Sequence, residues 1–237
     1  MLRMSVLTNT MSFLDRHPRF AKVFLRPLAN APVLSRRLPV LVRAYMGATA
    51  FEIHDVDVDR GRIGIGGVDE IMWSSKFLEL FHQVLASKMG AREKNDALYE
   101  VGRGGGYWEI SEALARGRWA PASLVELIEQ EGTLERLRTD PKLARFFELS
   151  MGMALRLIIN EGGWGVSRMD FQASPLRVTL ANSQEARWVG PADKPACYLS
   201  AGVIAGYSSR ILGHDLKAKE VRCMAMGHPE CVFELEE

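Results

Sequence analysis

Hydrophobic positions recur along the chain with two periods, one typical of helices and one typical of strands. Helical spacing predicts helices over residues 19–29, 35–46, 70–89, 92–116, 121–131, 141–160 and 195–212. Alternating spacing predicts a β-hairpin over residues 51–65 and further strands over residues 164–171, 176–182, 216–226 and 231–236. Successive strands beside helices indicate an α+β fold, in which helices pack on an antiparallel sheet.

One expected helix contains a cluster of glycines, at Gly102, Gly104, Gly105 and Gly106. Each glycine inside a helix costs about 1 kcal/mol relative to alanine. We therefore expect the cluster to interrupt the helix over residues 92–116, through a kink, a close helix crossing or a ligand against the backbone.

The N-terminal segment has a composition of its own. Residues 1–45 hold eight Arg and Lys residues against the single acid Asp15, interleaved with Phe, Leu and Val. Its prolines predict short helices, because each proline ring removes a backbone donor. We interpret residues 1–47 as a basic helical N-terminal extension and residues 48–237 as one further domain. Basic amphipathic helices bind partner proteins or anionic membrane surfaces, and residues 1–45 are the candidate segment.

The overall composition argues against several classes of protein. The chain is 47% hydrophobic and 25% charged, which is typical of a folded globular protein. Its net charge of +1 argues against direct nucleic-acid binding. Every apolar stretch is too short for a membrane span or a secretory signal, so we expect a soluble, cytoplasmic protein.

The three cysteines of the chain lie close to its C-terminus, at Cys197, Cys223 and Cys231. Cys223 and Cys231 flank a predicted turn at Gly227, so a hairpin would place their Cβ atoms about 4.5–5.5 Å apart. Cys197 begins the preceding helix, whose dipole favours a thiolate. Glu220 joins them only if its strand bulges or ends before Cys223.

This set of donor atoms indicates a metal. Three thiolates select zinc or iron over magnesium or calcium, and four protein ligands leave no open position, as in structural rather than catalytic sites. The expected result is a C-terminal hairpin clasped by zinc. The residues alone leave three alternatives open: His228 as the fourth ligand, three cysteines buried in the core, or a Cys223–Cys231 pair that oxidises.

A wider pattern surrounds the cysteines. It comprises Cys197-Tyr198, Gly202, Gly206-Tyr207-Ser208-Ser209, Gly213, Glu220-Val221, Cys223, Gly227, Cys231 and Phe233. The pattern resembles the 4-vinyl reductase domain family, which includes phenol- and xylene-sensing modules of bacterial transcription activators and proteins linked to bacteriochlorophyll synthesis. The family's fold is related to nitric-oxide-signalling and Golgi-transport ligand-binding domains. The resemblance is specific over residues 182–233, and it implies structural zinc held by Cys197, Glu220, Cys223 and Cys231.

The resemblance also implies a hydrophobic pocket between helices and sheet, and a homodimer. Ligand pockets are lined mainly by apolar and aromatic side chains with a few polar groups. The candidate ligand-binding residues are His82, Trp108, Phe147, Met151, Trp164, Trp188 and Tyr207. For each of them, ordinary core packing is the alternative. Gln184 stands where the aromatic sensors carry an aromatic residue, which argues against a monocyclic aromatic ligand.

The expected function is that of a sensor or carrier. Residues 48–237 would form a 4-vinyl-reductase-like, zinc-containing domain that binds a small hydrophobic molecule. A reductase would need a hydride donor, but Tyr107 stands where a dinucleotide fingerprint starting at Gly102 requires its third glycine. The sequence therefore does not favour an enzyme. The alternatives are an accessory protein or reductase in (bacterio)chlorophyll or tetrapyrrole metabolism, and a dimeric scaffold.

Overall fold

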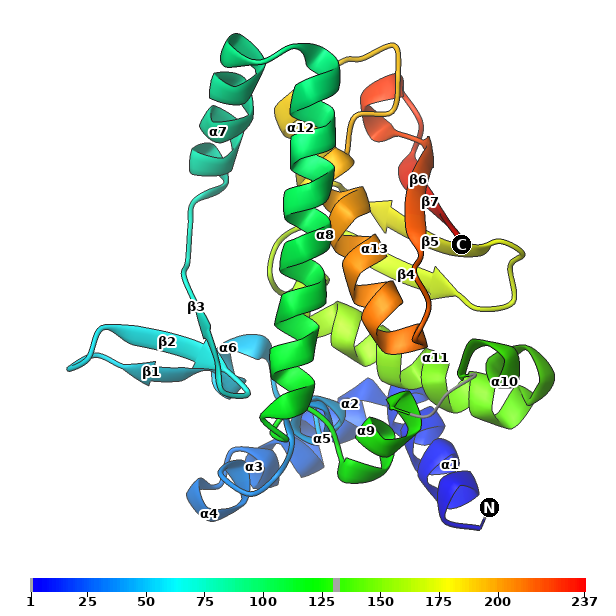
Figure 1. The fold of residues 1–237 in the computed structure, drawn as a ribbon. Helices are drawn as coiled ribbons and strands as arrows, with labels where there is room; N and C mark the ends of the chain where they lie inside the picture. Colours follow the sequence, from blue (N-terminus) through cyan, green and yellow to red (C-terminus); the bar gives the residue numbers. More distant parts are fainter. Residues whose placement is uncertain (1, 130–132) are drawn as a thin grey trace. The chain divides into compact units, whose positions relative to one another are not determined.

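The computed structural model describes residues 2–129 and 133–237 (Figure 1). Contacts divide the chain into two compact units, Met1–Ile71 with Glu112–Gly162, and Met72–Ser111 with Gly163–Glu237. We refer to these as the first and the second unit. Within the described residues, no helix combines the length and the hydropathy that a membrane span requires.

The first unit is mainly helical. Its elements are α1 (Leu2–Arg16), α2 (Pro18–Phe20), the π-helix η1 (Ala21–Leu25), α3 (Arg26–Ala29), α4 (Pro32–Ser35), α5 (Val40–Tyr45), α6 (Ala50–Ile53), β1 (Asp55–Asp57), β2 (Arg62–Ile65), β3 (Val68–Glu70), α9 (Ala122–Ile128), α10 (Thr133–Thr139), α11 (Pro141–Leu155) and the π-helix η2 (Arg156–Asn160). The three strands form a small antiparallel sheet. Helix α11 begins after Asp140 because this side chain accepts hydrogen bonds from the N–H groups of Lys142 and Leu143. Its buried face packs against α1 and α5.

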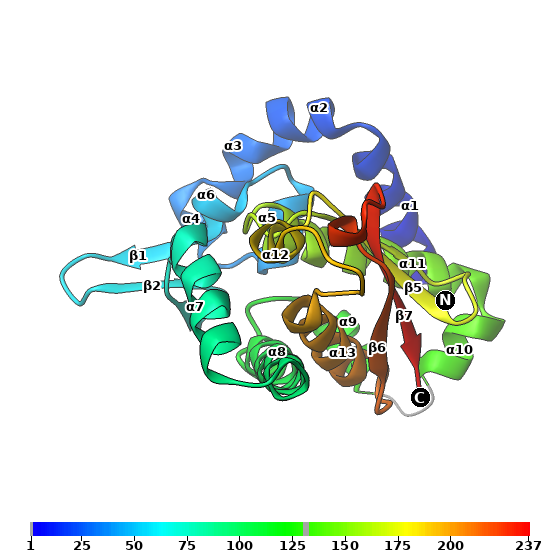
Figure 2. The same cartoon turned by 90° about the horizontal axis from the view of Figure 1, so that it is seen from above.

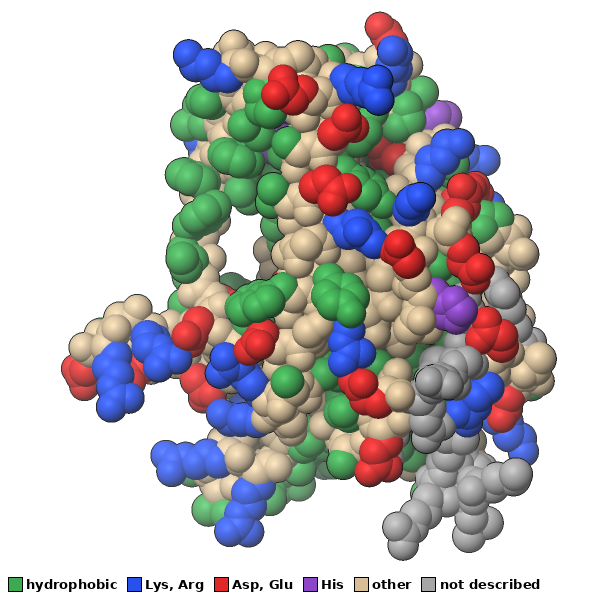
Figure 3. Space-filling model, viewed as in Figure 1, with side chains coloured by type: hydrophobic (Ala, Val, Ile, Leu, Met, Phe, Trp, Pro, Cys, Tyr) green, Lys and Arg blue, Asp and Glu red, His purple; other side chains and the backbone are tan. Residues whose placement is uncertain are grey.

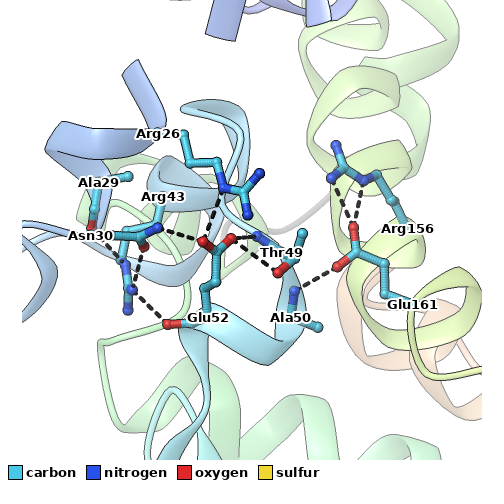
Figure 4. Close-up of polar contacts among 9 residues, drawn as sticks. All are labelled: Arg26, Ala29, Asn30, Arg43, Thr49, Ala50, Glu52, Arg156 and Glu161. Atoms are coloured by element: carbon cyan, nitrogen blue, oxygen red, sulfur yellow. Dashed lines mark hydrogen bonds and ion pairs between the residues drawn. The ribbon is translucent and has the colours of Figure 1, made fainter. Parts of the chain in front are cut away.

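A polar network fixes the N-terminal helices within the first unit (Figure 4). Glu52 Oε1 accepts hydrogen bonds from Arg26 Nε at 2.9 Å and from Asn30 Nδ2 at 2.8 Å. Its Oε2 accepts from the N–H and hydroxyl of Thr49, which caps α6. The buried Arg43 donates to the carbonyl oxygen of Glu52 at 2.9 Å and to Asn30 Oδ1 at 3.2 Å. Burial alone would raise the pKa of Glu52, but the bonds from Thr49 and Arg26 hold it below its ordinary value.

The second unit packs helices on a four-stranded sheet. Its elements are α7 (Ser75–Lys88), most of α8 (Ala91–Ala115), β4 (Val166–Asp170), β5 (Leu176–Ala181), α12 (Gln184–Val189), α13 (Tyr198–Leu212), β6 (Lys217–Arg222), the 3-10 helix η3 (Met224–Met226) and β7 (Glu230–Glu236). The strand order is β4-β5-β7-β6, with every neighbouring pair antiparallel. Leu176, Val178 and Leu180 alternate as buried positions of β5, so one face of the sheet belongs to the core. Helix α13 lies between α8 and the sheet (Figure 1 and Figure 2).

Helices α8 and α13 cross closely because glycines stand at the crossing. A methyl group on Gly102 would meet the carbonyl oxygen of Leu199, and one on Gly202 would meet that of Tyr99. The second glycine of each helix, one turn further along, is in the same situation. The glycine cluster therefore serves the close crossing, one of the three origins expected from the sequence. The expectation that it interrupts the helix is wrong, since α8 runs unbroken.

The α+β fold expected from the sequence is confirmed, with local differences. The expected strand over residues 51–53 is wrong: these residues belong to α6, because Thr49 and Glu52 form a capping box. Strand pairing begins only at Asp55, and β3 is a strand that the pattern did not predict. The helix expected to reach residue 131 ends at Ile128, and residue 131 itself lies outside the described residues. The domain boundary after residue 47 stays a prediction.

Candidate metal centre

The secondary structure of the second unit brings Cys197, Glu220, Cys223 and Cys231 together. Cys197 precedes α13 as its N-cap residue, and Cys231 lies in β7. Glu220 lies in β6, and Cys223 follows the last residue of that strand. Glu220 pairs with Phe233 while Arg222 pairs with Val232, so the register shifts between them. This bulge removes the strict alternation of side chains and lets Glu220 point to the same side as Cys223.

The four side chains form a compact and buried cluster. Their donor atoms all lie within 4.8 Å of one another. Cys197 Sγ is 3.7 Å from both Cys223 Sγ and Cys231 Sγ. Each thiol is at most 1% exposed and Glu220 is 9% exposed. Sulfur atoms at this separation are not bonded to one another, and three of them around one point suit a tetrahedral metal ion.

The carboxylate of Glu220 is only half satisfied by the protein. Its Oε2 accepts hydrogen bonds from the N–H groups of Ala196 and Cys197, at 2.8 and 2.9 Å. Its Oε1 is buried and has no hydrogen-bond partner among the described residues. Burial raises the pKa of Glu220 to about 7. A buried carboxylate oxygen without a partner is costly, and a metal ion at the centre of the cluster would satisfy it.

The thiols compete for protons in the same space. Contacts with Cys223 and Cys231, together with burial, raise the pKa of Cys197 above its ordinary value. The contact with Cys197 lowers the pKa of Cys223 below its ordinary value. Thiols that crowd together in this way bind a divalent cation as thiolates, because the cation replaces the protons. The residues present therefore fit a zinc ion.

The rival fourth ligand, His228, is not part of the cluster. Its side chain is exposed in the turn between η3 and β7, and the group of potential ligands contains Glu220 instead. The choice between the two follows from the bulge in β6.

Three of the candidate ligand-binding residues form an aromatic group in the second unit. The ring of His82, on α7, lies 5.7 Å from that of Trp188 on α12, and Trp188 lies 5.9 Å from Trp164. His82 is 4% exposed, and neither of its ring nitrogens has a hydrogen-bond partner among the described residues. Burial, and secondarily the charge of Lys94, lower the pKa of His82, so the imidazole is neutral at neutral pH.

The other candidate ligand-binding residues lie elsewhere. Tyr207 is buried on α13, whereas Trp108 on α8 is 58% exposed. Phe147 and Met151 are buried on α11, which belongs to the first unit. The assignment of all seven residues to one ligand site stays a prediction.

Comparisons with known proteins bear on the segment that holds the cluster. Residues 176–237 match the sequence model of the vinyl-4-reductase domain. This segment belongs to the vinyl-4-reductase domain family. It contains Cys197, Glu220, Cys223 and Cys231, and the match confirms the resemblance to the 4-vinyl reductase domain family that the sequence pattern indicated.

Solved structures show how far the fold of the chain is shared. The chain is similar to the phenol-responsive sensory domain of the transcription activator PoxR, crystallised with phenol: the identity is 18%, the TM-score 0.54, and the match covers 78% of this chain and 85% of that one. A vinyl-4-reductase family protein from Methanocaldococcus jannaschii matches with 18% identity and a TM-score of 0.41, over 71% of this chain and 83% of that one. No curated protein matches. The first likeness places a shared fold around the vinyl-4-reductase domain.

One buried acid of the vinyl-4-reductase domain was missed by the sequence reasoning. Glu185 is 1% exposed and accepts hydrogen bonds from the N–H groups of Leu199 and Ser200 and from the Ser200 hydroxyl, at 2.9, 2.7 and 2.6 Å. It therefore caps α13 directly after Cys197. Burial raises its pKa to about 7, although these bonds act in the opposite direction. The signal available in the sequence was Ser183, whose hydroxyl accepts from the N–H of Ala186 at the start of α12.

An open hollow of about 660 Å³ lies beside the cysteine cluster. It is lined by residues 186–187, 190–193 and 224–227, the last group being the turn that follows Cys223. None of the candidate ligand-binding residues lines it. The hollow therefore gives no support to the predicted hydrophobic pocket.

Proposed function

We propose that this chain is a zinc-containing domain that binds a small hydrophobic molecule and acts as a sensor or carrier. Two features support it: the cluster of three thiols and one carboxylate, and the buried His82 beside two indoles. The fold shared with a phenol-responsive sensory domain agrees with both. The observation that carries the ligand-binding part is the buried imidazole, because nothing in the described protein satisfies either nitrogen.

In this proposal the zinc ion has a structural role. Cys197, Glu220, Cys223 and Cys231 would supply all four ligands, so no position remains for a water or a substrate. The ion would join the start of α13 to the β6–β7 hairpin across a long stretch of sequence. Glu185 and Glu220 prepare the start of α13 by accepting its free N–H groups.

The surroundings of His82 indicate which ligand chemistry would fit. A neutral imidazole offers one donor and one acceptor, and leaving such a buried group unpaired costs about 1–3 kcal/mol. A ligand with a hydroxyl or carbonyl group would satisfy one nitrogen, while Trp188 and Trp164 contact its apolar part. The proposed ligand is therefore a small, uncharged, largely apolar molecule with one polar group.

Replacing His82 by Phe tests this part of the proposal. Phenol and 1-naphthol serve as probes, and the quenching of tryptophan fluorescence reports binding near Trp164 and Trp188. We expect His82→Phe to weaken binding by about tenfold, which corresponds to one lost hydrogen bond. His228→Phe, which changes an exposed imidazole, is the matched control and should bind as the unaltered protein does. Equal binding by both variants, or no binding of either probe, would contradict the assignment.

We further propose that the domain is a homodimer that associates through α7. This helix exposes an apolar stripe with helical spacing, at Phe77, Leu80, Phe81 and Val84, each between 41% and 55% exposed. Exposed apolar patches of this kind mark association surfaces. The second copy would cover the stripe with its own, as in most two-fold dimers.

Charge on the stripe should separate the subunits. We expect Leu80→Lys with Val84→Lys to yield a monomer in light scattering coupled to size-exclusion chromatography. Ala86→Lys adds the same kind of charge at an exposed position outside the stripe and should leave the dimer intact. A monomer before any substitution, or a dimer that survives the double substitution, would show that α7 is not the interface.

A further inference from the structure

The segment from α2 to α4 has a fixed inner side. Ala21 and Ala29 are 3% and 0% exposed. The network around Glu52 holds Arg26 and Asn30 from the same side (Figure 4). The segment is thus a docked part of the first unit, and its outer side chains form a defined surface.

The outer side of this segment is apolar and aromatic. The rings of Phe13 and Phe20 lie 5.6 Å apart and those of Phe20 and Phe24 lie 5.1 Å apart, so the three form a row. Phe24 is 63% exposed, and Val23 and Val33 are 64% and 66% exposed. A contiguous exposed apolar patch marks an interaction surface. We call this row and its aliphatic neighbours the N-terminal face.

Unpaired cations surround the N-terminal face. Between Asp15 and Glu52 the sequence contains no acidic residue. The exposed cations are Arg16, Arg19, Lys22, Arg36 and Arg37. None of them forms an ion pair with a residue in the part of the chain that the structure describes. Figure 3 shows basic and hydrophobic side chains next to one another over α3 and α4.

The charge of the chain is segregated along its length. Residues 1–45 hold eight basic residues and one acid, which leaves 22 basic and 28 acidic residues for the remainder. An anionic surface would therefore attract the N-terminal segment and repel the rest of the chain. Such a distribution favours one orientation on a charged plane.

We propose that the N-terminal face binds the surface of an anionic lipid membrane. The aromatic rings and aliphatic side chains would enter the boundary between headgroups and acyl chains, and the surrounding cations would contact anionic headgroups. A nucleic acid would also attract the cations and stack on the rings, but it offers no apolar phase for Val23 and Val33. The contact is peripheral, since no described helix has the properties of a membrane span.

Vesicle sedimentation of the full chain tests this inference. We expect the protein to sediment with vesicles of phosphatidylcholine mixed with phosphatidylserine, and to stay in solution with phosphatidylcholine alone. Phe20→Ser with Phe24→Ser, and Arg19→Glu with Lys22→Glu, should each weaken binding by about tenfold or more. Lys217→Glu with Lys219→Glu makes the same charge change at exposed positions of β6, and this control should bind as the unaltered protein does. Thermal unfolding of every variant checks that it is folded.

Three results would overturn the inference. The first is equal sedimentation with neutral and anionic vesicles. The second is a loss of binding in the β6 control as large as that in the N-terminal variants, because it would reduce the effect to net charge. The third is a short single-stranded oligonucleotide that binds the N-terminal face while anionic vesicles do not.

Discussion

Cys223→Ser is expected to release the bound zinc and to lower the free energy of unfolding by several kcal/mol. The reason is that zinc binding in small structural sites contributes on the order of 10 kcal/mol to folding, and a serine hydroxyl is a poor ligand at neutral pH. Removal of one ligand also leaves two thiols and the Oε1 of Glu220 buried without a partner. Chemical denaturation of the protein and the variant measures the difference.

His228→Ala is the control for this prediction. His228 lies only five residues beyond Cys223 and could bind zinc by its chemistry, but its side chain is exposed outside the cluster. The variant should therefore keep its metal and its stability. Loss of zinc from His228→Ala, or an unchanged unfolding transition in Cys223→Ser, would contradict the proposed ligand set.

The second large effect is expected at the crossing of α8 and α13. Gly102→Ala places a methyl group against the backbone of Leu199 and Val203, and backbone atoms cannot move aside as a flexible side chain can. We expect a loss of stability of about 3 kcal/mol or more, the upper part of the range for overpacked sites. Gly105→Ala meets nothing within 4 Å and should stabilise the protein by up to about 1 kcal/mol, because alanine favours a helix.

These two substitutions differ in sign although they lie three residues apart in one helix. Thermal unfolding of the two variants side by side measures this contrast. If both variants gained stability, α8 and α13 would not be in backbone contact. If both lost stability to the same extent, the effect would not come from the crossing.

The cysteine cluster could be predicted from the sequence because local geometry determines most of it. A turn at Gly227 with Cys223 and Cys231 on either side brings two thiols together in any antiparallel hairpin. The place of Glu220 depends on a bulge after it, and a bulge has no reliable signature in a single sequence. The donor set was thus readable, while the reason for its fourth member was not.

Other features depend on partners far away in the sequence. Glu185 is buried because the free N–H groups of α13 receive it, and nothing near residue 185 announces them. The glycine cluster of α8 was visible, but only the matching Gly202 on α13 shows that it serves a crossing rather than a break. Residues 51–53 alternate like a strand, yet the capping box of Thr49 and Glu52 is the stronger local signal.

The measurement that tests the central claim most directly is native mass spectrometry of freshly purified protein, followed by the same measurement after treatment with a strong chelator. We predict a mass increment of one zinc ion per chain, with loss of two or more protons, and a lower unfolding temperature once the ion is removed. A chain that carries no metal in the first spectrum, and whose unfolding the chelator leaves unchanged, would contradict the account.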